Sequence, residues 1–432
     1  MHFWLITVGE PLPQLSGESR LWRTGMVAGE LVRRGHRVTW WTSSVDHFRK
    51  EFFGVTGKLL QIAPGFVLRF LCGRLYRKNL SLDRLLNHWQ IGREFRRECG
   101  NADAPDAILC SFPTIELSLE AVRFAKRNRI PVLLDVRDLW PDIFPQAAPA
   151  ALRPLVRLAF SRYFSATRRA LRDADALIAV SDGYLDWGLA RAGRARRSLD
   201  RVFPLAYSLP EVTAESRAAG LEMLHRYGVD ERSIVCLFAG TMGRTYDFAP
   251  VLECARRFSR DGLRRFHFLF CGDGERAPHW RGAAEGLPNV SFTGWLDQSH
   301  LRAALSAAHI GLAAYAPAAP QGLPNKVIEY LAAGLPVLSS LTGETARLLA
   351  DAQCGLTYDA GDASSLANAL LSLQSPDARQ PLAMNARRTF EARFRAETVY
   401  ARLADHLESV AAAARRDGVP AIPSTAIQPT TG

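Results

Sequence analysis

The chain has 432 residues, of which 48% are hydrophobic and 22% are charged, and its formal net charge is +11. This length predicts two or three domains, each large enough to bury a core of its own. The excess of positive charge points to an anionic partner, which could be nucleic acid, an acidic bilayer surface or a phosphorylated substrate.

Seven cysteines are scattered along the chain, and none forms a CxxC pair. This pattern excludes the usual disulfide framework and the usual zinc sites. The apolar N-terminal run HFWLITV is too short for a membrane span and lacks the features of a signal peptide. We therefore expect a cytoplasmic protein, either free or resting at the inner face of the plasma membrane.

The first half of the chain alternates between apolar runs and helical patterns, which is typical of a doubly wound parallel sheet. The insert Arg49–Cys99 interrupts this alternation. We expect strands at His2–Val8, Val38–Thr42, Ala107–Cys110, Val132–Asp135 and Ala176–Val180, and helices at Ser19–Arg34, Glu116–Asn128, Leu152–Arg172 and from Ser181, as N-cap, to Ala190.

The insert Arg49–Cys99 contains eleven Lys or Arg residues against four Asp or Glu, interleaved with aromatic and aliphatic residues, as in Phe66–Leu71. This mixture suits shallow contact with anionic lipid, where apolar side chains enter the interface and cations meet headgroups. A solvated helical surface is the ordinary alternative, and nucleic-acid binding is a third.

The pattern breaks around Val202–Glu211, at Pro204 and Pro210, and we place a domain boundary there. A second α/β series follows. We expect strands at Ile234–Ala239, Phe266–Cys271, Val290–Phe292, Ile310–Ala313 and Val337–Ser340, and helices at Phe248–Phe258, Leu301–Ala307, Glu344–Ala350, Ala363–Leu373 and Ala383–Ser409. The predicted domains are 1–205 and 206–385, followed by a C-terminal helix over 386–410 that packs on the first domain and a disordered tail over 411–432.

The stretch GLPNKVIEYLAAGLPVLS, Gly322–Ser339, combines a helix start with two charged residues. Asn325 is expected to cap the helix, and Gly334 to end it in the left-handed conformation. Lys326 and Glu329 are three residues apart and therefore share one face. A cation near a helix N-terminus suits a diphosphate, and a carboxylate suits ribose hydroxyls. An amphipathic helix with two surface charges is equally compatible with this spacing.

Three glycine-bearing turns follow predicted strands. The first contains Gly17, ahead of the first long helix, and the second contains Gly240, Gly243 and Arg244. Glycine lets backbone approach a ligand closely, and the planar fork of Arg244 could pair with a diphosphate. A tight turn with a solvent-facing arginine is the alternative. The third turn, CGDGE at Cys271–Glu275, is common and indicates little alone.

The loop DVRDLWPD, Asp135–Asp142, follows a strand end, where ligands of open α/β sheets gather. Its carboxylates, including Asp138, and the indole of Trp140 suit a hydroxylated sugar. The alternative is a structural arginine–aspartate pair beside a buried tryptophan. The sequence contains no GxSxG, HExxH or Walker motif, so nothing favours a serine hydrolase, a zinc enzyme or a kinase.

Together these stretches resemble a family. Eight stretches carry this resemblance: SGESR, RRGHRVTW, DVRDLWPD, VSDGYL, FAGTMGR, CGDGE, VSFTGWL and PNKVIEYLAAGLPVLS. They are similar to motifs of retaining GT-B glycosyltransferases of family 4. The closest resemblance is to bacterial members that build O-antigen, capsule or exopolysaccharide, including fucosamine-type transferases. The resemblance implies two Rossmann-like α/β domains facing across a cleft, with the nucleotide held mainly by the second. It also implies transfer of a sugar from a nucleotide-sugar donor, expected to be a UDP-sugar, to a lipid-linked or saccharide acceptor.

The resemblance also implies roles for individual residues. Glu329 would bind ribose, while Lys326 and Arg244 would bind the diphosphate and stabilise its charge as it leaves. The backbone at Gly17, Gly240 and Gly243, with Asn325 at the helix start, would approach the donor. Trp295 would lie near the base, and Asp138 near the acceptor. No metal, other cofactor or nucleic-acid partner is implied.

Two positions depart from the family pattern. Gln321 stands where the motif has another glutamate, and Thr241 stands where a basic residue is common. These departures leave open a different donor or reduced activity. The alternatives to a transferase are a non-hydrolysing UDP-sugar 2-epimerase and a catalytically silent sugar-nucleotide-binding scaffold within a polysaccharide assembly complex.

Overall fold

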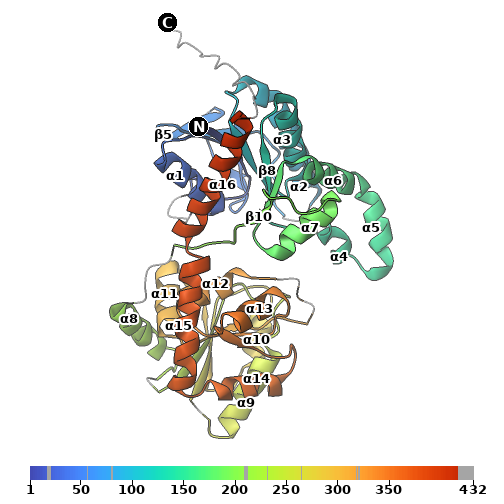
Figure 1. Ribbon diagram of the computed structural model, residues 1–432. Helices are drawn as coiled ribbons and strands as arrows, with labels where there is room; N and C mark the ends of the chain where they lie inside the picture. Colours follow the sequence, from blue (N-terminus) through green and yellow to red (C-terminus); the bar gives the residue numbers. More distant parts are fainter. Residues whose placement is uncertain are drawn as a thin grey trace. The chain divides into compact units, whose positions relative to one another are not determined.

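The computed structural model describes residues 1–16, 21–55, 57–78, 81–208, 213–230, 232–263, 265–317, 319 and 322–416. The chain divides into two compact units: an N-terminal unit of Met1–Leu205 with the C-terminal segment from Ala396, and a second unit of Ala206–Arg395. Each unit is an α/β fold around a mainly parallel sheet (Figure 1). The predicted fold class of two Rossmann-like domains is confirmed.

The sheet of the N-terminal unit has the strand order β10-β9-β8-β7-β1-β2-β6-β5, and only the edge pair β5–β6 is antiparallel. Its central strands are largely buried, and β1 and β8 are buried throughout, because helices cover both faces. The strands are β1 (His2–Ile6), β2 (Arg37–Ser43), β5 (Leu59–Ala63), β6 (Phe66–Leu71), β7 (Ala107–Phe112), β8 (Val132–Val136), β9 (Ala176–Ala179) and β10 (Arg201–Val202), with a separate ribbon of β3 (Val45–Asp46) and β4 (Glu51–Phe52).

The helices of this unit largely follow the expected pattern. Ser181 caps α7 by accepting from the Tyr184 backbone N–H, as predicted. The helix expected over Leu152–Arg172 is interrupted at Phe160. The helices are α1 (Arg23–Arg33), α2 (Leu82–Glu98), α3 (Ile115–Asn128), α4 (Ile143–Ala147), α5 (Arg153–Ala159), α6 (Ser161–Asp173), α7 (Asp182–Ala192) and α16 (Ala396–Arg416), with short 3₁₀ turns η1 (Cys99–Asn101) and η2 (Ala150–Leu152).

The structure changes the interpretation of the insert. The apolar residues of Phe66–Leu71 alternate because β6 joins the sheet beside β2, and Phe66, Leu68 and Phe70 are buried. They are therefore not available to a lipid surface. The exposed apolar residues of the insert lie mainly elsewhere, notably on α2.

The second unit has a fully parallel sheet in the order β13-β12-β11-β14-β15-β16. The strands are β11 (Ile234–Ala239), β12 (Phe266–Cys271), β13 (Val290–Gly294), β14 (Ile310–Ala313), β15 (Val337–Ser339) and β16 (Gly355–Thr357). The helices are α8 (Ala214–His225), α9 (Ala249–Arg260), α10 (Ala277–Ala283), α11 (Gln298–Ala307), α12 (Asn325–Ala332), α13 (Glu344–Asp351), α14 (Ala363–Ser372) and α15 (Pro376–Arg393).

The single helix expected over Ala383–Ser409 is two helices. α15 ends at Arg393 within the second unit, and α16 begins at Ala396 within the N-terminal unit. α16 lies beside α1, where Arg34 pairs with Asp405 at 2.6 Å and with Glu408 at 3.0 Å. Residues 411–416, which were expected in the tail, are the last turns of α16, and the rest of the predicted tail lies outside the described residues.

All seven cysteines are free, and only Cys72 is exposed. Within the described ranges, no helix has the length and apolar character that a membrane crossing requires. In the same ranges, no group of three or more His, Cys, Asp or Glu side chains is arranged to hold a metal ion.

The packing of α8 against α11 depends on Gly220. A Cβ built there would lie 2.1 Å from the carbonyl oxygen of Ala303. We expect Gly220→Ala to lower the free energy of unfolding by about 1–3 kcal/mol, because the helices would have to separate. Denaturant unfolding measures the change.

Gly282 in α10 is the matched control, because a Cβ there meets nothing within 4 Å. Gly282→Ala should raise the free energy of unfolding by about 0.5–1 kcal/mol, the usual gain in helix propensity. Equal effects of the two substitutions would contradict the assigned packing.

Candidate functional site

The candidate site lies at the carboxyl edge of the second sheet, where two glycine turns pack against each other. Gly240 N donates to the Cys271 carbonyl at 2.9 Å, and Met242 N donates to the Asp273 carbonyl at 2.8 Å. A Cβ at Gly272 would lie 2.1 Å from the Gly240 oxygen, so the contact requires glycine. The CGDGE turn therefore supports the AGTMGR turn.

Lys326 lies in the first turn of α12 and is buried, with 6% of its surface exposed. Its Nζ lies 3.6 Å from the ring centroid of Phe238, 3.9 Å from that of Tyr246 and 5.7 Å from that of Tyr315. Within the described part of the chain, Nζ has no hydrogen-bond partner. The lysine thus occupies an aromatic box, defined here as Phe238, Tyr246 and Tyr315.

Burial lowers the pKa of Lys326 well below its ordinary value, while the carboxylate of Glu329 acts in the opposite direction. The ring faces also favour the charged form, because their quadrupole attracts cations. A buried amine without an acceptor is nevertheless costly. Groups with strongly shifted pKa values cluster at functional sites, and this amine is suited to an anionic ligand.

Gly240 leaves room beside this amine. Its φ of +135° is a conformation that side-chain-bearing residues rarely adopt. A Cβ at this position would lie 3.3 Å from Lys326 Nζ. The structure therefore brings Gly240 and Lys326 together, as the predicted site requires.

Tyr330 holds α12 in place, and sequence reasoning did not single it out. Its hydroxyl accepts from Ala239 N at 3.0 Å and donates to the Leu312 carbonyl at 3.1 Å. A Cβ at Gly311 would lie 2.4 Å from the Tyr330 ring. Tyr330 thus ties the helix that carries Lys326 to β11 and β14. In the sequence, Tyr330 is recognisable only as one of the apolar residues of the predicted helix, next to Glu329.

The remaining predicted residues of the second unit are more exposed. Glu329 is partly buried on α12, one turn after Lys326. Gly243 has open space around its Cα, and Trp295 is 71% exposed. Arg244, with a side chain 80% exposed, pairs with Glu275 at 2.7 Å, so part of its hydrogen-bonding capacity is already used.

The predicted role of Asn325 as helix cap is wrong. Pro324 occupies the N-cap position, and its side chain makes no capping hydrogen bond. Asn325 is instead the first residue of α12 and is exposed. The end of the helix is as predicted, because Gly334 has a φ of +68°. Gly17 and Gln321 lie outside the described residues.

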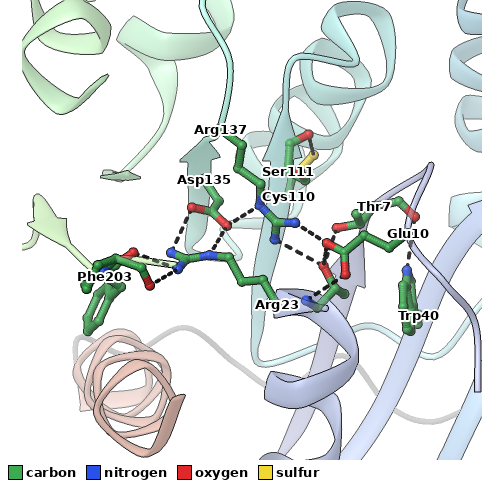
Figure 2. Close-up of polar contacts among 11 residues, drawn as sticks. Thr7, Glu10, Arg23, Trp40, Cys110, Ser111, Asp135, Arg137 and Phe203 are labelled. Atoms are coloured by element: carbon green, nitrogen blue, oxygen red, sulfur yellow. Dashed lines mark hydrogen bonds and ion pairs between the residues drawn. The ribbon is translucent and has the colours of Figure 1, made fainter. Parts of the chain in front are cut away.

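In the N-terminal unit, Asp135 belongs to a buried charge network (Figure 2). It accepts from Arg23 Nε at 2.7 Å and from Arg137 Nε at 2.6 Å. Arg137 also contacts Glu10, which accepts from Thr24 N at 3.0 Å. Burial would raise the pKa of Asp135, but the two arginines hold it below its ordinary value. This carboxylate is therefore fully engaged in structure.

The rest of the DVRDLWPD loop divides between structure and surface. Trp140 is 3% exposed and packs beneath Arg84 and His88, so its face is not available to stack on a sugar. Asp142 accepts from Trp187 Nε1 at 2.7 Å and from Arg191. For this part of the loop the structural interpretation is correct.

Asp138 is the carboxylate of this loop that keeps some exposure. Its Oδ1 accepts from Leu139 N at 2.8 Å. Burial raises its pKa above the ordinary value, and Arg84 acts in the opposite direction. A partly exposed carboxyl at the end of β8 remains suited to bind a hydroxyl.

Comparison with known proteins agrees with this architecture. A family model described as "Glycosyl transferase 4-like domain" matches residues 22–204, and one described as "Glycosyl transferases group 1" matches residues 233–375. No curated protein sequence matches the chain.

Solved structures share the fold over nearly the whole chain. Sucrose-phosphate synthase from Thermosynechococcus elongatus is 17% identical, with a TM-score of 0.68 over 95% of this chain and 99% of that one. Anabaena HepE in complex with UDP is 14% identical, with a TM-score of 0.62 over 94% and 99%. WaaG, a glycosyltransferase involved in lipopolysaccharide biosynthesis, is 16% identical, with a TM-score of 0.61 over 94% and 99%. The two family models and the shared fold place this chain among the GT-B glycosyltransferases.

Proposed function

We propose that the protein is a retaining glycosyltransferase that moves a sugar from a UDP-sugar to a lipid-linked or saccharide acceptor in cell-surface polysaccharide synthesis. The observation that carries the proposal is Lys326, whose buried amine lies beside a glycine turn and has no acceptor among the residues the structure describes. HepE, which shares the fold, binds UDP and UDP-glucose, and WaaG acts in lipopolysaccharide biosynthesis. The complexes of HepE support a UDP-sugar donor, and the pathway of WaaG supports a role in cell-surface polysaccharide synthesis.

In the proposed reaction, the bond between the anomeric carbon and the diphosphate oxygen breaks, and its electron pair leaves with UDP. The acceptor oxygen bonds to the same face of the anomeric carbon, and its proton passes to the departing diphosphate oxygen. Lys326 and the N-terminus of α12 stabilise the developing negative charge. Arg244 contributes after its pairing with Glu275 is exchanged for the diphosphate.

The other predicted residues take supporting roles in this proposal. Glu329 accepts from the ribose hydroxyls, and the exposed indole of Trp295 lies beside the base. Asn325 and the backbone at Gly240 and Gly243 form the walls of the donor site. The role of Gly17, which lies outside the described residues, stays a prediction. Asp138 orients the acceptor or the sugar. The proposal invokes no metal and no other cofactor.

We also propose that the protein works in the cytoplasm at an anionic membrane surface, with Arg49–Cys99 as one contact. The support is on α2, where Leu82, Leu86 and Trp89 are 78%, 45% and 51% exposed along one side of the helix.

Incubation with UDP-sugars and a lipid-linked acceptor tests the reaction. Release of UDP that requires the acceptor, with a product of retained configuration, would support the proposal. Formation of an epimer without acceptor would identify an epimerase instead. Binding of the donor without turnover under all conditions would identify a silent scaffold.

Lys326→Met is expected to weaken UDP binding at least tenfold, because the diphosphate loses its buried cation. The same substitution should raise the free energy of unfolding at neutral pH by about 1–3 kcal/mol, since an unpaired polar group leaves the interior. Calorimetric titration and denaturant unfolding measure the two effects. Lys126→Met, at a solvent-exposed lysine of the N-terminal unit, should leave UDP binding unchanged. A less stable Lys326→Met protein with normal UDP affinity would exclude the assigned role.

The lowered pKa of Lys326 predicts that donor binding takes up a proton. Bound diphosphate should raise this pKa again, so affinity should fall as pH rises above the pKa of the free protein, by up to about tenfold per pH unit. Titration of a UDP-sugar over a range of pH below the ordinary pKa of lysine, in two buffers of different ionisation enthalpy, measures the uptake. Lys326→Gln should show no such uptake, and its absence from the wild-type protein would contradict the prediction.

Glu329→Ala should weaken UDP binding by about 1–3 kcal/mol, because the ribose hydroxyls lose a charged acceptor. Comparison of UDP with the 2′,3′-dideoxy analogue localises the effect, since the variant should no longer distinguish the two. Glu285→Ala, at an exposed position of the same unit, is the control. Full discrimination retained by Glu329→Ala would assign ribose binding to another residue.

A further inference from the structure

The proposed donor site does not yet use Glu344, a partly buried carboxylate at the same edge of the second sheet. Glu344 is the first residue of α13, the element that follows β15. Because the strands of this sheet are parallel, the loop between β15 and α13 leaves the same edge as Gly240 and the start of α12. β15 pairs directly with β14, whose own loop leads to α12.

Hydrogen bonds attach the loop after β15 to the segment that leads into α12. Ser340 Oγ accepts from Tyr315 N at 2.7 Å and donates to the Tyr315 carbonyl at 2.8 Å. Thr345 N donates to the Gly322 carbonyl at 3.1 Å, and Thr345 Oγ1 donates to the same carbonyl. Tyr315 belongs to the aromatic box, and Gly322 lies shortly before α12. Glu344 is therefore held between two fixed points beside the candidate site.

The side chain of Glu344 lies against the backbone of Gly322. A Cβ built on Gly322 would lie 3.0 Å from Glu344 Oε2 and 3.9 Å from Glu344 Cβ. Gly322 does not have a positive φ. A side chain at this position would therefore disturb the carboxylate rather than the backbone.

The order of groups along α12 indicates which part of a nucleotide sugar this carboxylate would meet. In the proposed donor site, Glu329 binds the ribose and Lys326 binds the diphosphate, so the donor runs toward the start of the helix. A nucleotide sugar continues from the ribose through two phosphates to the sugar. Gly322 lies beyond Lys326 in that direction. The sugar end of the donor would therefore lie next to Glu344.

The chemistry of a carboxylate restricts what it can bind there. An ionised carboxylate accepts hydrogen bonds and donates none. It repels phosphate oxygens, so its partner in the donor must be a hydroxyl or an amide N–H of the sugar. A site that pairs with such a group also rejects a sugar that lacks it, because the buried acceptor is then left unpaired.

We propose that Glu344 binds a hydroxyl or amide N–H of the transferred sugar and thereby contributes to the choice of donor, with Gly322 leaving the space for its carboxylate. This inference rests on the proposed function, because the direction of the donor is taken from Lys326 and Glu329. The simpler alternative is that Glu344 only complements the positive end of α13, as acidic residues in a first turn commonly do.

Calorimetric titration of Glu344→Gln with UDP and with a UDP-sugar tests the proposal. The probes are UDP-glucose, UDP-galactose and UDP-N-acetylglucosamine, and the one that the wild-type protein binds most tightly is used. The variant should bind this UDP-sugar about tenfold more weakly than the wild type does, because a neutral amide is a weaker acceptor than a carboxylate. It should bind UDP as the wild type does. Gly322→Ala should cause the same selective loss, because its methyl group displaces the carboxylate.

Analogues of the UDP-sugar that lack a single hydroxyl or the acetamido group localise the contact. Removal of the group that Glu344 accepts from should weaken binding to the wild-type protein about tenfold and leave binding to Glu344→Gln unchanged. Glu215→Gln is the matched control, because Glu215 is an exposed residue in the first turn of another helix, α8. It should change neither affinity. Melting curves show whether each variant is folded.

Three results would overturn this assignment and leave the nucleotide site in place. The first is a Glu344→Gln variant that binds the UDP-sugar as tightly as the wild type does. The second is an equal loss of affinity for UDP and the UDP-sugar, which a purely structural role at the start of α13 would give. The third is a wild-type protein that binds UDP but none of the three UDP-sugars. A wild-type protein that binds neither UDP nor a UDP-sugar would instead remove the proposed donor site, and this assignment with it.

Discussion

A buried amine that has no hydrogen-bond partner among the described residues is the constraint on which the donor unit depends. Lys326 keeps its Nζ over the rings of Phe238 and Tyr246, where water is largely excluded. Tyr330 maintains this arrangement by hydrogen-bonding α12 to two strands. Gly240 contributes because it has no Cβ, which would lie 3.3 Å from Nζ. A site of this kind gives up stability in the free protein and recovers it when an anion binds.

The N-terminal unit handles buried charge in the opposite way. Arg23, Arg137, Asp135 and Glu10 place two cations against two carboxylates, and backbone groups complete their hydrogen bonds. A buried network that is fully satisfied fixes the positions of the loops that share it. Here it joins the loop after β8 to the start of α1. The buried charges of the N-terminal unit are therefore structural, whereas the buried amine of Lys326 in the second unit is available to a ligand.

The fold was largely predictable because its signals are local. Continuous apolar runs such as Phe266–Cys271 and Ile310–Ala313 are strands at the expected residues. The errors arose where a local pattern has two meanings. The alternation in Phe66–Leu71 suits both a lipid surface and a strand, and pairing with β2 decides between them. Asn325 has the chemistry of a cap, but the backbone turns one residue earlier, at Pro324.

The sequence by itself determined the two α/β halves, the helix that carries Lys326 and Glu329, and the glycine turn at Gly240, because these follow from periodicity and from backbone preferences of single residues. Only the tertiary structure decided which charged groups are free. Arg244 meets Glu275, 31 positions away, and the aromatic box around Lys326 comes from three separate segments. Burial and partner choice depend on contacts between distant parts of the chain, and no local pattern records them.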